Sequence, residues 1–306
     1  MINQPISFKS VYLGYKLKQK TMKKTTLSFA KKYLILPMLA ISFTMVSCKK
    51  EDVIDEEPTP TGEAVPGSFT KKVLMEEFTG EWCGYCPDGA TIMKGIITAN
   101  PNRVIAASVH QGDFLAISQY STLNSFLDVK GFPRSAVNRT PAQGTSSGGS
   151  QDGLLVYSRG NWNTNVTREL SKTAICGLKL ETTVSGTTAE IKVSCGANTA
   201  IDGAHLTVYL TEDGIPESTS GAQSGAGPGY INDEVLRACV SNGTGDAIDL
   251  NSSELATKTY SGIDISGYNK SNLKVVAFIH KHVTSPKDYE VLNVQEVHIG
   301  ETKSWD

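Results

Sequence analysis

The first 47 residues contain no acidic side chain, although they carry eight lysines. Over all 306 residues, 29 basic residues nearly balance 31 acidic ones. Without those eight lysines, 29 − 8 = 21 basic residues face 31 acidic ones, a net charge of −10. A body this acidic repels phosphate backbones, which excludes nucleic acid as an expected partner. The length predicts about two domains of ~150 residues each.

The N-terminal region also lacks an apolar run long enough to cross a bilayer. The run from Tyr33 to Val46 has 14 residues and is interrupted by Pro37, whereas a helix needs about 20 residues to span the hydrocarbon core. Lysines precede this run and small residues follow it, which is typical of a secretory signal. We therefore predict that residues 1–47 are a signal peptide, with Met22 as an alternative start.

Cys48 follows this signal directly. The stretch Met45-Val46-Ser47-Cys48 resembles the lipobox of bacterial lipoproteins, with Met where Leu is usual. The resemblance implies that Cys48 becomes a lipidated N-terminus that holds the protein on a membrane. The alternative is ordinary cleavage with Cys48 as a bystander. Residues 48–68 are acidic, contain three prolines and lack apolar periodicity, which predicts a solvated tether.

Cysteine is scarce, and only one Cys-x-x-Cys motif occurs, in Trp82-Cys83-Gly84-Tyr85-Cys86-Pro87. Residues 72–78 before it predict a strand, and residues 88–99 after it predict a helix. A helix N-terminus stabilises a thiolate on Cys83, and Pro87 is tolerated in a first helical turn. Zinc is disfavoured because no second such motif exists. A reactive disulfide and a purely structural one both remain open.

The stretch EFTGEWCGYC resembles the active-site segment of the thioredoxin fold. That fold has a buried acid six residues before the first cysteine and a cis-proline opposite the dithiol. The matching positions are Glu77 and Pro133. The resemblance implies that Cys83 is the nucleophile, Cys86 the resolving thiol and Glu77 a proton relay. It implies no cofactor beyond the dithiol, and it implies three residues that dock substrate beside Pro133, namely Trp82, Tyr85 and Phe132.

The Gly84-Tyr85 pair resembles that of periplasmic disulfide isomerases, which implies a less reducing couple than that of thioredoxin. Three histidines are further candidates. His110 ends a predicted strand and either lies near the dithiol or is a surface residue, which we favour. His280 and His282 alternate at another strand end, where a solvated edge is favoured over a metal site.

From residue 173 onward, short strand patterns alternate with Gly-rich connections such as Ser218–Gly229. We predict an α+β chain with a thioredoxin-like domain at 69–172 and an antiparallel β-sandwich, Ig-like or jelly-roll-like, at 173–306. A hairpin about Ser185-Gly186 would place Cys176 opposite Cys195. Both a disulfide and two buried thiols are compatible with this register, and we expect the disulfide. Cys239 is then unpaired.

The mature chain resembles the 28-kilodalton outer-membrane protein family of Gram-negative lipoproteins. The matching stretches are the TGEWCGYCP segment, YINDEVLR at Tyr230–Arg237 and LKVVAFI at Leu273–Ile279. The resemblance implies lipid anchoring at the outer membrane, on its periplasmic face or at the cell surface. Asn232 and Asp233 stand where relatives often have histidines, so no metal role is implied.

Two functions follow as expectations. The first is thiol–disulfide exchange with exported proteins or an envelope redox partner, which requires an accessible Cys83 beside a cis Phe132–Pro133 bond. The second is a surface binding or adhesion module, which predicts a covered or inert Cys83 and an exposed apolar or aromatic patch on the sandwich.

Overall fold

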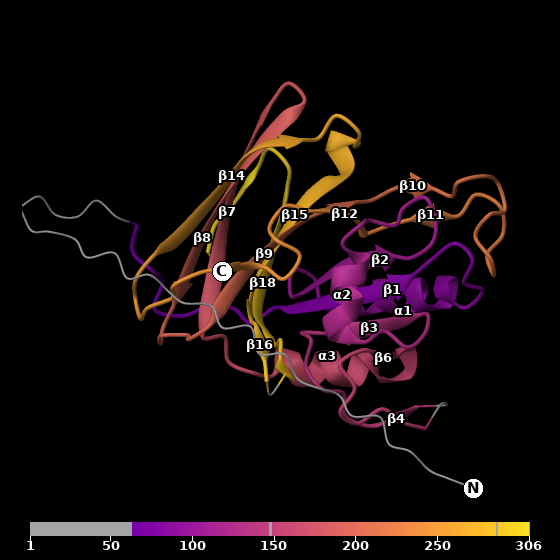
Figure 1. Cartoon of the computed structure of the whole chain (residues 1–306), viewed down its shortest axis with the longest axis horizontal. Coiled ribbons are helices and arrows are strands. Elements are labelled where there is room, and N and C mark those ends of the chain that lie inside the picture. The colour runs from indigo at the N-terminus through magenta and orange to yellow at the C-terminus, as the bar shows by residue number, and fades with distance from the viewer. Residues whose placement is uncertain (1–62, 147–148, 286, 306) are drawn as a thin grey trace, which may run out of the picture. The chain divides into compact units, whose positions relative to one another are not determined.

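The computed structural model describes residues 63–146, 149–285 and 287–305. The predicted signal peptide, Cys48 and the tether up to residue 62 lie outside the described residues. The fold is mixed α+β, with many strands and few helices (Figure 1). The helices are α1 (Cys86–Ala99), α2 (Tyr120–Leu127) and α3 (Trp162–Leu170), with 3-10 turns η1 (Arg159–Asn161) and η2 (Lys270–Asn272).

The strands form two main sheets and three small ones. The large sheet contains β1 (Val73–Thr79), β2 (Val104–His110), β3 (Arg134–Val137), β6 (Tyr157–Ser158), β9 (Ala204–Glu212), β12 (Val235–Cys239), β13 (Asp246–Ala247), β15 (Leu273–Lys281) and β18 (Val291–His298). The second contains β7 (Cys176–Ser185), β8 (Thr188–Ala197), β14 (Ala256–Asp264) and β19 (Thr302–Lys303). The short pairs are β4 (Thr145–Ser146) with β5 (Gly149–Ser150), β10 (Ile215–Pro216) with β11 (Ile231–Asn232), and β16 (Val283–Thr284) with β17 (Lys287–Asp288).

The large sheet runs through both halves of the chain in the order β18-β15-β9-β12-β2-β1-β3-β6, with β13 beside β9. Its halves join where β12 pairs in parallel with β2, and the Ser108 N–H donates to the Glu234 carbonyl at 2.7 Å. The boundary predicted between residues 172 and 173 therefore does not separate two bodies, and the described residues from 63 onward lie in one compact unit. The edge of β2 is covered by a strand from the C-terminal half, which a pattern read along the chain does not reveal.

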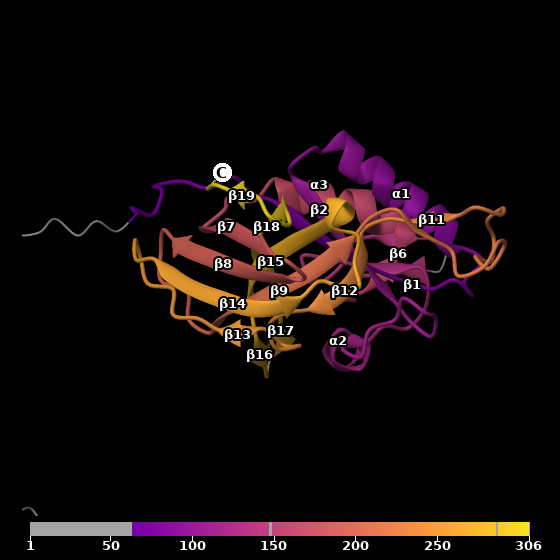
Figure 2. The ribbon, with the colours of Figure 1, turned by 90° about the horizontal axis from the view of Figure 1, so that it is seen from above.

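Helices cover both faces of the N-terminal half of this sheet, as Figure 2 shows. Val73 and Met75 of β1 pack on the face that α1 and α3 cover, whereas Leu74 and Phe78 pack on the face that α2 covers. This alternation follows from the two-residue period of a strand, and every residue of β1 is buried. Glu76 and Glu77 are consequently buried on opposite faces.

The predicted sandwich forms between the four-stranded sheet and the C-terminal strands of the large sheet. Alternate residues of β7 and β8 meet alternate residues of β9 and β15 in one apolar core. The other face of β9 and β15 packs against α2. Each sheet thus contributes one apolar face to the contact, as face-to-face packing of two sheets requires.

The β7–β8 hairpin differs from its prediction by two residues in register. Ser185 pairs with Thr188, so that Gly186 begins the turn with a φ of 60°. Cys176 consequently lies opposite Ala197, and Cys195 lies opposite Leu178. Both cysteines are buried free thiols, and the predicted disulfide between them is wrong. Burial raises the pKa of the Cys176 thiol to about 12.

A buried ion pair links the N-terminal strands to the C-terminal ones. Arg139 donates from Nε and Nη2 to the two carboxylate oxygens of Glu76, both at 2.7 Å. The hydroxyl of Tyr209, on β9, donates to Glu76 at 3.0 Å. The guanidinium lies over the rings of Phe126 and Phe278, 5.2 and 4.9 Å from their centroids. The carboxylate is thereby fully compensated inside the core.

Candidate functional site

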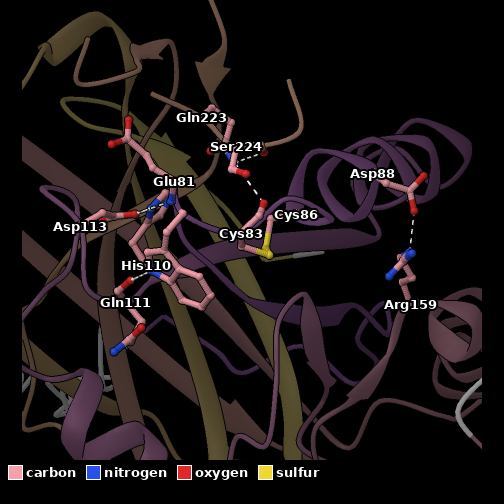
Figure 3. The surroundings of a disulfide bond; sticks show 11 residues. Glu81, Cys83, Cys86, Asp88, His110, Gln111, Asp113, Arg159, Gln223 and Ser224 are labelled. Carbon is pink, nitrogen blue, oxygen red and sulfur yellow. Dashed lines mark hydrogen bonds and ion pairs between the residues drawn. A yellow bond between two sulfur atoms is a disulfide. The ribbon is translucent and has the colours of Figure 1, made fainter. Parts of the chain in front are cut away.

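Cys83 and Cys86 form a disulfide in the turn between β1 and α1 (Figure 3), with their Cα atoms 5.4 Å apart. The N–H of Cys83 donates to the Gly80 carbonyl at 3.0 Å, which closes the turn ahead of the helix. Pro87 lies in the first turn of α1, where its missing N–H costs no helical hydrogen bond. The predicted position of the dithiol between a strand and a helix N-terminus is confirmed.

The disulfide is covered by a segment that is distant in sequence. Cys83 is only 5% exposed. The Gln223 side chain donates to the Cys83 carbonyl at 3.4 Å, and the Ser224 N–H donates to the Glu81 carbonyl at 2.7 Å. Figure 3 shows Gln223 and Ser224 beside Cys83. The pattern of Ser218–Gly229 predicts only a connection, because periodicity gives no information about contacts between residues 140 positions apart.

Glu77 lies on β1, on the face that α1 covers, and is 1% exposed. Burial raises the pKa of its carboxyl group to about 8. Within the described part of the chain, Glu77 Oε1 has no hydrogen-bond partner. A Cβ on Gly89 would lie 2.6 Å from Glu77 Oε1 and 2.8 Å from the Pro133 Cβ. Glycine at position 89 therefore lets the helix approach both predicted site residues.

The Phe132–Pro133 peptide bond is cis, as predicted. Phe132 packs edge-on against Trp82, with ring centroids 5.0 Å apart, and the Trp82 indole N–H donates to the Gln111 carbonyl at 2.6 Å. Trp82 and Tyr85 are 49% and 70% exposed. Phe114 is also exposed, and it was not predicted because a single aromatic residue in a loop has no periodicity.

A cavity of about 440 Å³ extends from Glu77 toward the C-terminal half. One wall is formed by β1, β2 and α1, and the other by Tyr230–Glu234, which belongs to the YINDEVLR stretch. Burial and then the nearby charge of Glu77 raise the pKa of the Tyr230 phenol to about 12. The buried carboxyl thus faces a space large enough for several water molecules.

His110 is buried beside this turn, so the favoured assignment to the surface is wrong. Its Nδ1 lies 2.7 Å from Asp113 Oδ2, and the same oxygen accepts the Glu81 N–H at 2.9 Å. Burial opposes ionisation of Asp113, but the hydrogen bond and charge of His110 hold the pKa of its carboxyl group below the usual value. His110 therefore reaches the dithiol turn through Asp113 and Glu81, and it lines the cavity that contains Glu77.

The remaining candidates lie away from the disulfide. His280 is fully buried, and its Nε2 is 2.9 Å from Thr207 Oγ1, so the predicted solvated edge is wrong for it. Among the residues that the structure describes, no group of three His, Cys, Asp or Glu could hold a metal ion. Cys239 is a half-buried free thiol, as expected.

No helix within 63–146, 149–285 and 287–305 is long and apolar enough to cross a membrane. The family model for outer membrane protein Omp28 matches residues 120–303. This range begins after the Cys83–Cys86 turn. No curated protein matches the sequence.

Three solved structures are similar to this chain. HBP35 of Porphyromonas gingivalis has a TM-score of 0.64 at 23% identity, covering 76% of this chain and 77% of that one, which shows a shared fold. A protein from Agrobacterium tumefaciens has a TM-score of 0.48 at 12% identity, over 78% of this chain and 98% of its own. A domain of the outer membrane lipoprotein Omp28 from Porphyromonas gingivalis has a TM-score of 0.26 at 22% identity, over 42% and 89%.

Proposed function

The chain belongs to the Omp28 family of outer membrane proteins, and we propose that within this family it catalyses thiol–disulfide exchange at Cys83–Cys86. The observation that carries the proposal is a disulfide at the N-terminus of α1, together with a buried Glu77 that lies against Gly89 of the same helix and whose Oε1 has no partner among the described residues. The order β1, α1, β2, with β3 antiparallel to β1 after a cis-proline, supports a thioredoxin-like arrangement around this site.

The chemistry of the oxidised form follows from the charge state of Glu77. A thiolate of an exported dithiol protein attacks Cys83 Sγ, the Cys83–Cys86 bond breaks, and Cys86 leaves as a thiolate. Below a pH of about 8 the Glu77 carboxyl group holds a proton. In the proposed reaction it gives this proton to the Cys86 thiolate. The second thiolate of the substrate then attacks the substrate sulfur of the mixed disulfide. This closes the disulfide of the substrate and releases Cys83. The substrate loses two electrons and two protons, and the dithiol gains them after Glu77 is reprotonated from water.

The exposed aromatic side chains around the disulfide support a polypeptide substrate. Trp82 and Tyr85 flank the Cys83–Cys86 turn, and Phe132 packs against Trp82. Pro133 has no N–H, so the backbone beside it is free to pair with an extended substrate strand. We infer that substrate docks along Phe132–Pro133 and against these rings.

The covering of Cys83 favours a second candidate, a binding module that uses the same fold as a scaffold. Its predicted signature was a covered Cys83 with an exposed patch on the sandwich. The first part agrees with a Cys83 that is 5% exposed. However, the exposed aromatic residues Trp82 and Tyr85 lie in the disulfide turn, whereas β7, β8 and β14 carry a single exposed large apolar residue, Val184, which favours exchange.

A trapping experiment in cells tests the proposal. With Cys86→Ser, Cys83 cannot be released by its resolving thiol, so mixed disulfides accumulate as reducible high-mass bands on a non-reducing gel. The matched control is Cys83→Ser/Cys86→Ser, which must show none. A Cys86→Ser protein that remains free of partners, beside a wild-type protein that stays fully oxidised, favours the binding module instead.

We further propose that Cys48 carries the lipid that holds the protein at the outer membrane. The support is the lipobox-like stretch before Cys48 together with the membership in the Omp28 family. Labelled fatty acid should be incorporated into the wild-type chain and not into Cys48→Ser. Labelling of the variant contradicts this anchor.

A further inference from the structure

The segment that covers the disulfide, residues 217–229, is organised around one of its own carboxylates. Glu217 accepts the N–H groups of Gly221, Gln223 and Gly229 at 2.7–2.9 Å. Backbone hydrogen bonds, that of Gln223 first, lower the pKa of Glu217 to about 2. The carboxylate is therefore charged at any physiological pH and keeps the segment folded on itself. Strands β10 and β11 close its base.

Glu81 attaches this segment to the dithiol turn. Its carboxylate accepts the N–H and the hydroxyl of Ser218, both at 2.7 Å. Its carbonyl accepts the Ser224 N–H at 2.7 Å. Glu81 itself is buried and is held on its other side by Asp113. One residue two positions before Cys83 thus makes three of the hydrogen bonds that fix the segment.

The contact with Gly84, the residue after Cys83, depends on two glycines. Gly225 has a φ of 79°, and a Cβ on it would overlap the Gly84 carbonyl oxygen. A Cβ on Gly84 would in turn lie 3.4 Å from Ser224 Oγ. The backbones of the segment and of the Cys83–Cys86 turn therefore touch directly, with no side chain between them. This contact adds to the low exposure of Cys83.

We propose that residues 217–229 are a lid that restricts access to Cys83, and that Glu81 is the positioning residue that holds the lid closed. The biological role of the lid rests on the proposed function: the lid would admit only those partners that break the hydrogen bonds between Ser218 and Glu81. Its physical claim is independent of any substrate. Opening of the lid exposes Cys83 without unfolding the sheets beneath it.

The test measures how fast iodoacetamide alkylates Cys83 in the reduced full chain carrying Cys86→Ser, with the modified site identified by mass spectrometry. Gly225→Ala pushes the lid off Gly84, and we expect a rise of about tenfold in the rate of Cys83 alkylation. Gly221→Ala is the matched control, because Gly221 has nearly the same φ, 81°, with open space around its added Cβ. It should leave the rate close to that of the parent.

Two further readouts separate access from other causes. Glu81→Gln, which keeps the size of the side chain, should raise the rate in the same direction as Gly225→Ala. In Gly225→Ala, the rate of Cys83 alkylation at its high-pH plateau should rise while the pH midpoint of the rate stays fixed. The reason is that the lid controls access to Cys83 and not the fraction of Cys83 that is thiolate. Cys176 and Cys195 must stay unlabelled, which reports an intact core.

Equal rates in Gly225→Ala and Gly221→Ala overturn the lid, and so does a change confined to the pH midpoint. Neither result bears on mixed disulfides in cells, which test the exchange reaction itself. Conversely, if the protein traps no partner in cells but shows the expected alkylation rates, the lid is supported and the proposed exchange activity is contradicted.

Discussion

Glu76 and Glu77 are neighbours in β1, both are buried, and they point to opposite faces of the same sheet. Glu76 lies on the α2 face, where Arg139 and Tyr209 satisfy both of its oxygens. Glu77 lies on the α1 face, where burial raises the pKa of its carboxyl group to about 8 and Oε1 has no partner among the described residues. The two glutamates are equally buried, and they differ in their hydrogen-bond partners.

The comparison separates a structural acid from a chemical one. A buried carboxylate whose oxygens are satisfied by a guanidinium and a hydroxyl serves the packing of the core. A buried carboxyl without them stays neutral near physiological pH, and it exchanges protons when a neighbouring group changes charge. Only the second kind is useful beside a disulfide whose cleavage creates a thiolate. Glu77, which lies against Gly89 of the helix that begins at Cys86, is thus the chemically informative acid.

The largest expected effect comes from removing the partner of Glu76. Arg139→Met leaves a buried carboxylate uncompensated, and we expect a loss of about 3–5 kcal/mol in the free energy of unfolding. Urea denaturation at pH 7 measures it. The double variant Glu76→Met/Arg139→Met should regain most of this loss, because it removes the charge as well as its partner. A small cost for the single variant contradicts the description of Glu76 as a compensated charge.

The next effect concerns Glu77 and has a defined pH window. Unfolded Glu77 loses its proton near pH 4.5, whereas folded Glu77 keeps it up to about pH 8. Between these values the folded state binds more protons, so its stability falls as pH rises, by about 1.4 kcal/mol per pH unit from this group. Below pH 4.5 the group contributes no slope, and above about pH 8 the loss is complete.

Glu77→Gln should remove this slope. The difference in unfolding free energy between the two proteins, measured by urea denaturation at pH 5, 6, 7 and 8, should grow steadily in favour of the variant. Parallel curves for wild type and variant across this window contradict a raised pKa at Glu77.

The smallest effect comes from the second donor to Glu76. Tyr209→Phe removes one hydrogen bond while the Arg139 pair stays in place, and we expect a loss of about 1 kcal/mol in unfolding free energy. Thermal or urea denaturation of Tyr209→Phe and Arg139→Met under the same conditions compares the two losses in unfolding free energy. A loss as large as that of Arg139→Met would mean that the hydroxyl, and not the guanidinium, compensates the carboxylate.

Much of the N-terminal half could be predicted from the sequence. The strand before the dithiol and the helix after it lie where their periodicity placed them. The resemblance to the thioredoxin fold also predicted that Glu77 is buried, and it is. These features are local, because each follows from spacing within about twenty residues.

The features that were missed are long-range. The pairing of β12 with β2, the lid over Cys83 and the Asp113–Glu81 contact join segments that periodicity cannot relate. The Cys176–Cys195 prediction failed for a smaller reason, since moving the turn by one residue shifts the opposed pair by two. His280 was misjudged because its strand end is covered by other elements, and Gly245 approaches its ring.

The most direct test of the central claim, that Glu77 passes a proton to Cys86, is the single-turnover rate at which the oxidised protein accepts electrons from a dithiol peptide. After correction for the thiolate fraction of the peptide, the wild-type rate should be constant below about pH 8 and fall above it, since Glu77 then has no proton to give. Glu77→Gln should be slower by about 10²-fold and show no such fall. Identical pH profiles and rates in the two proteins would contradict the account.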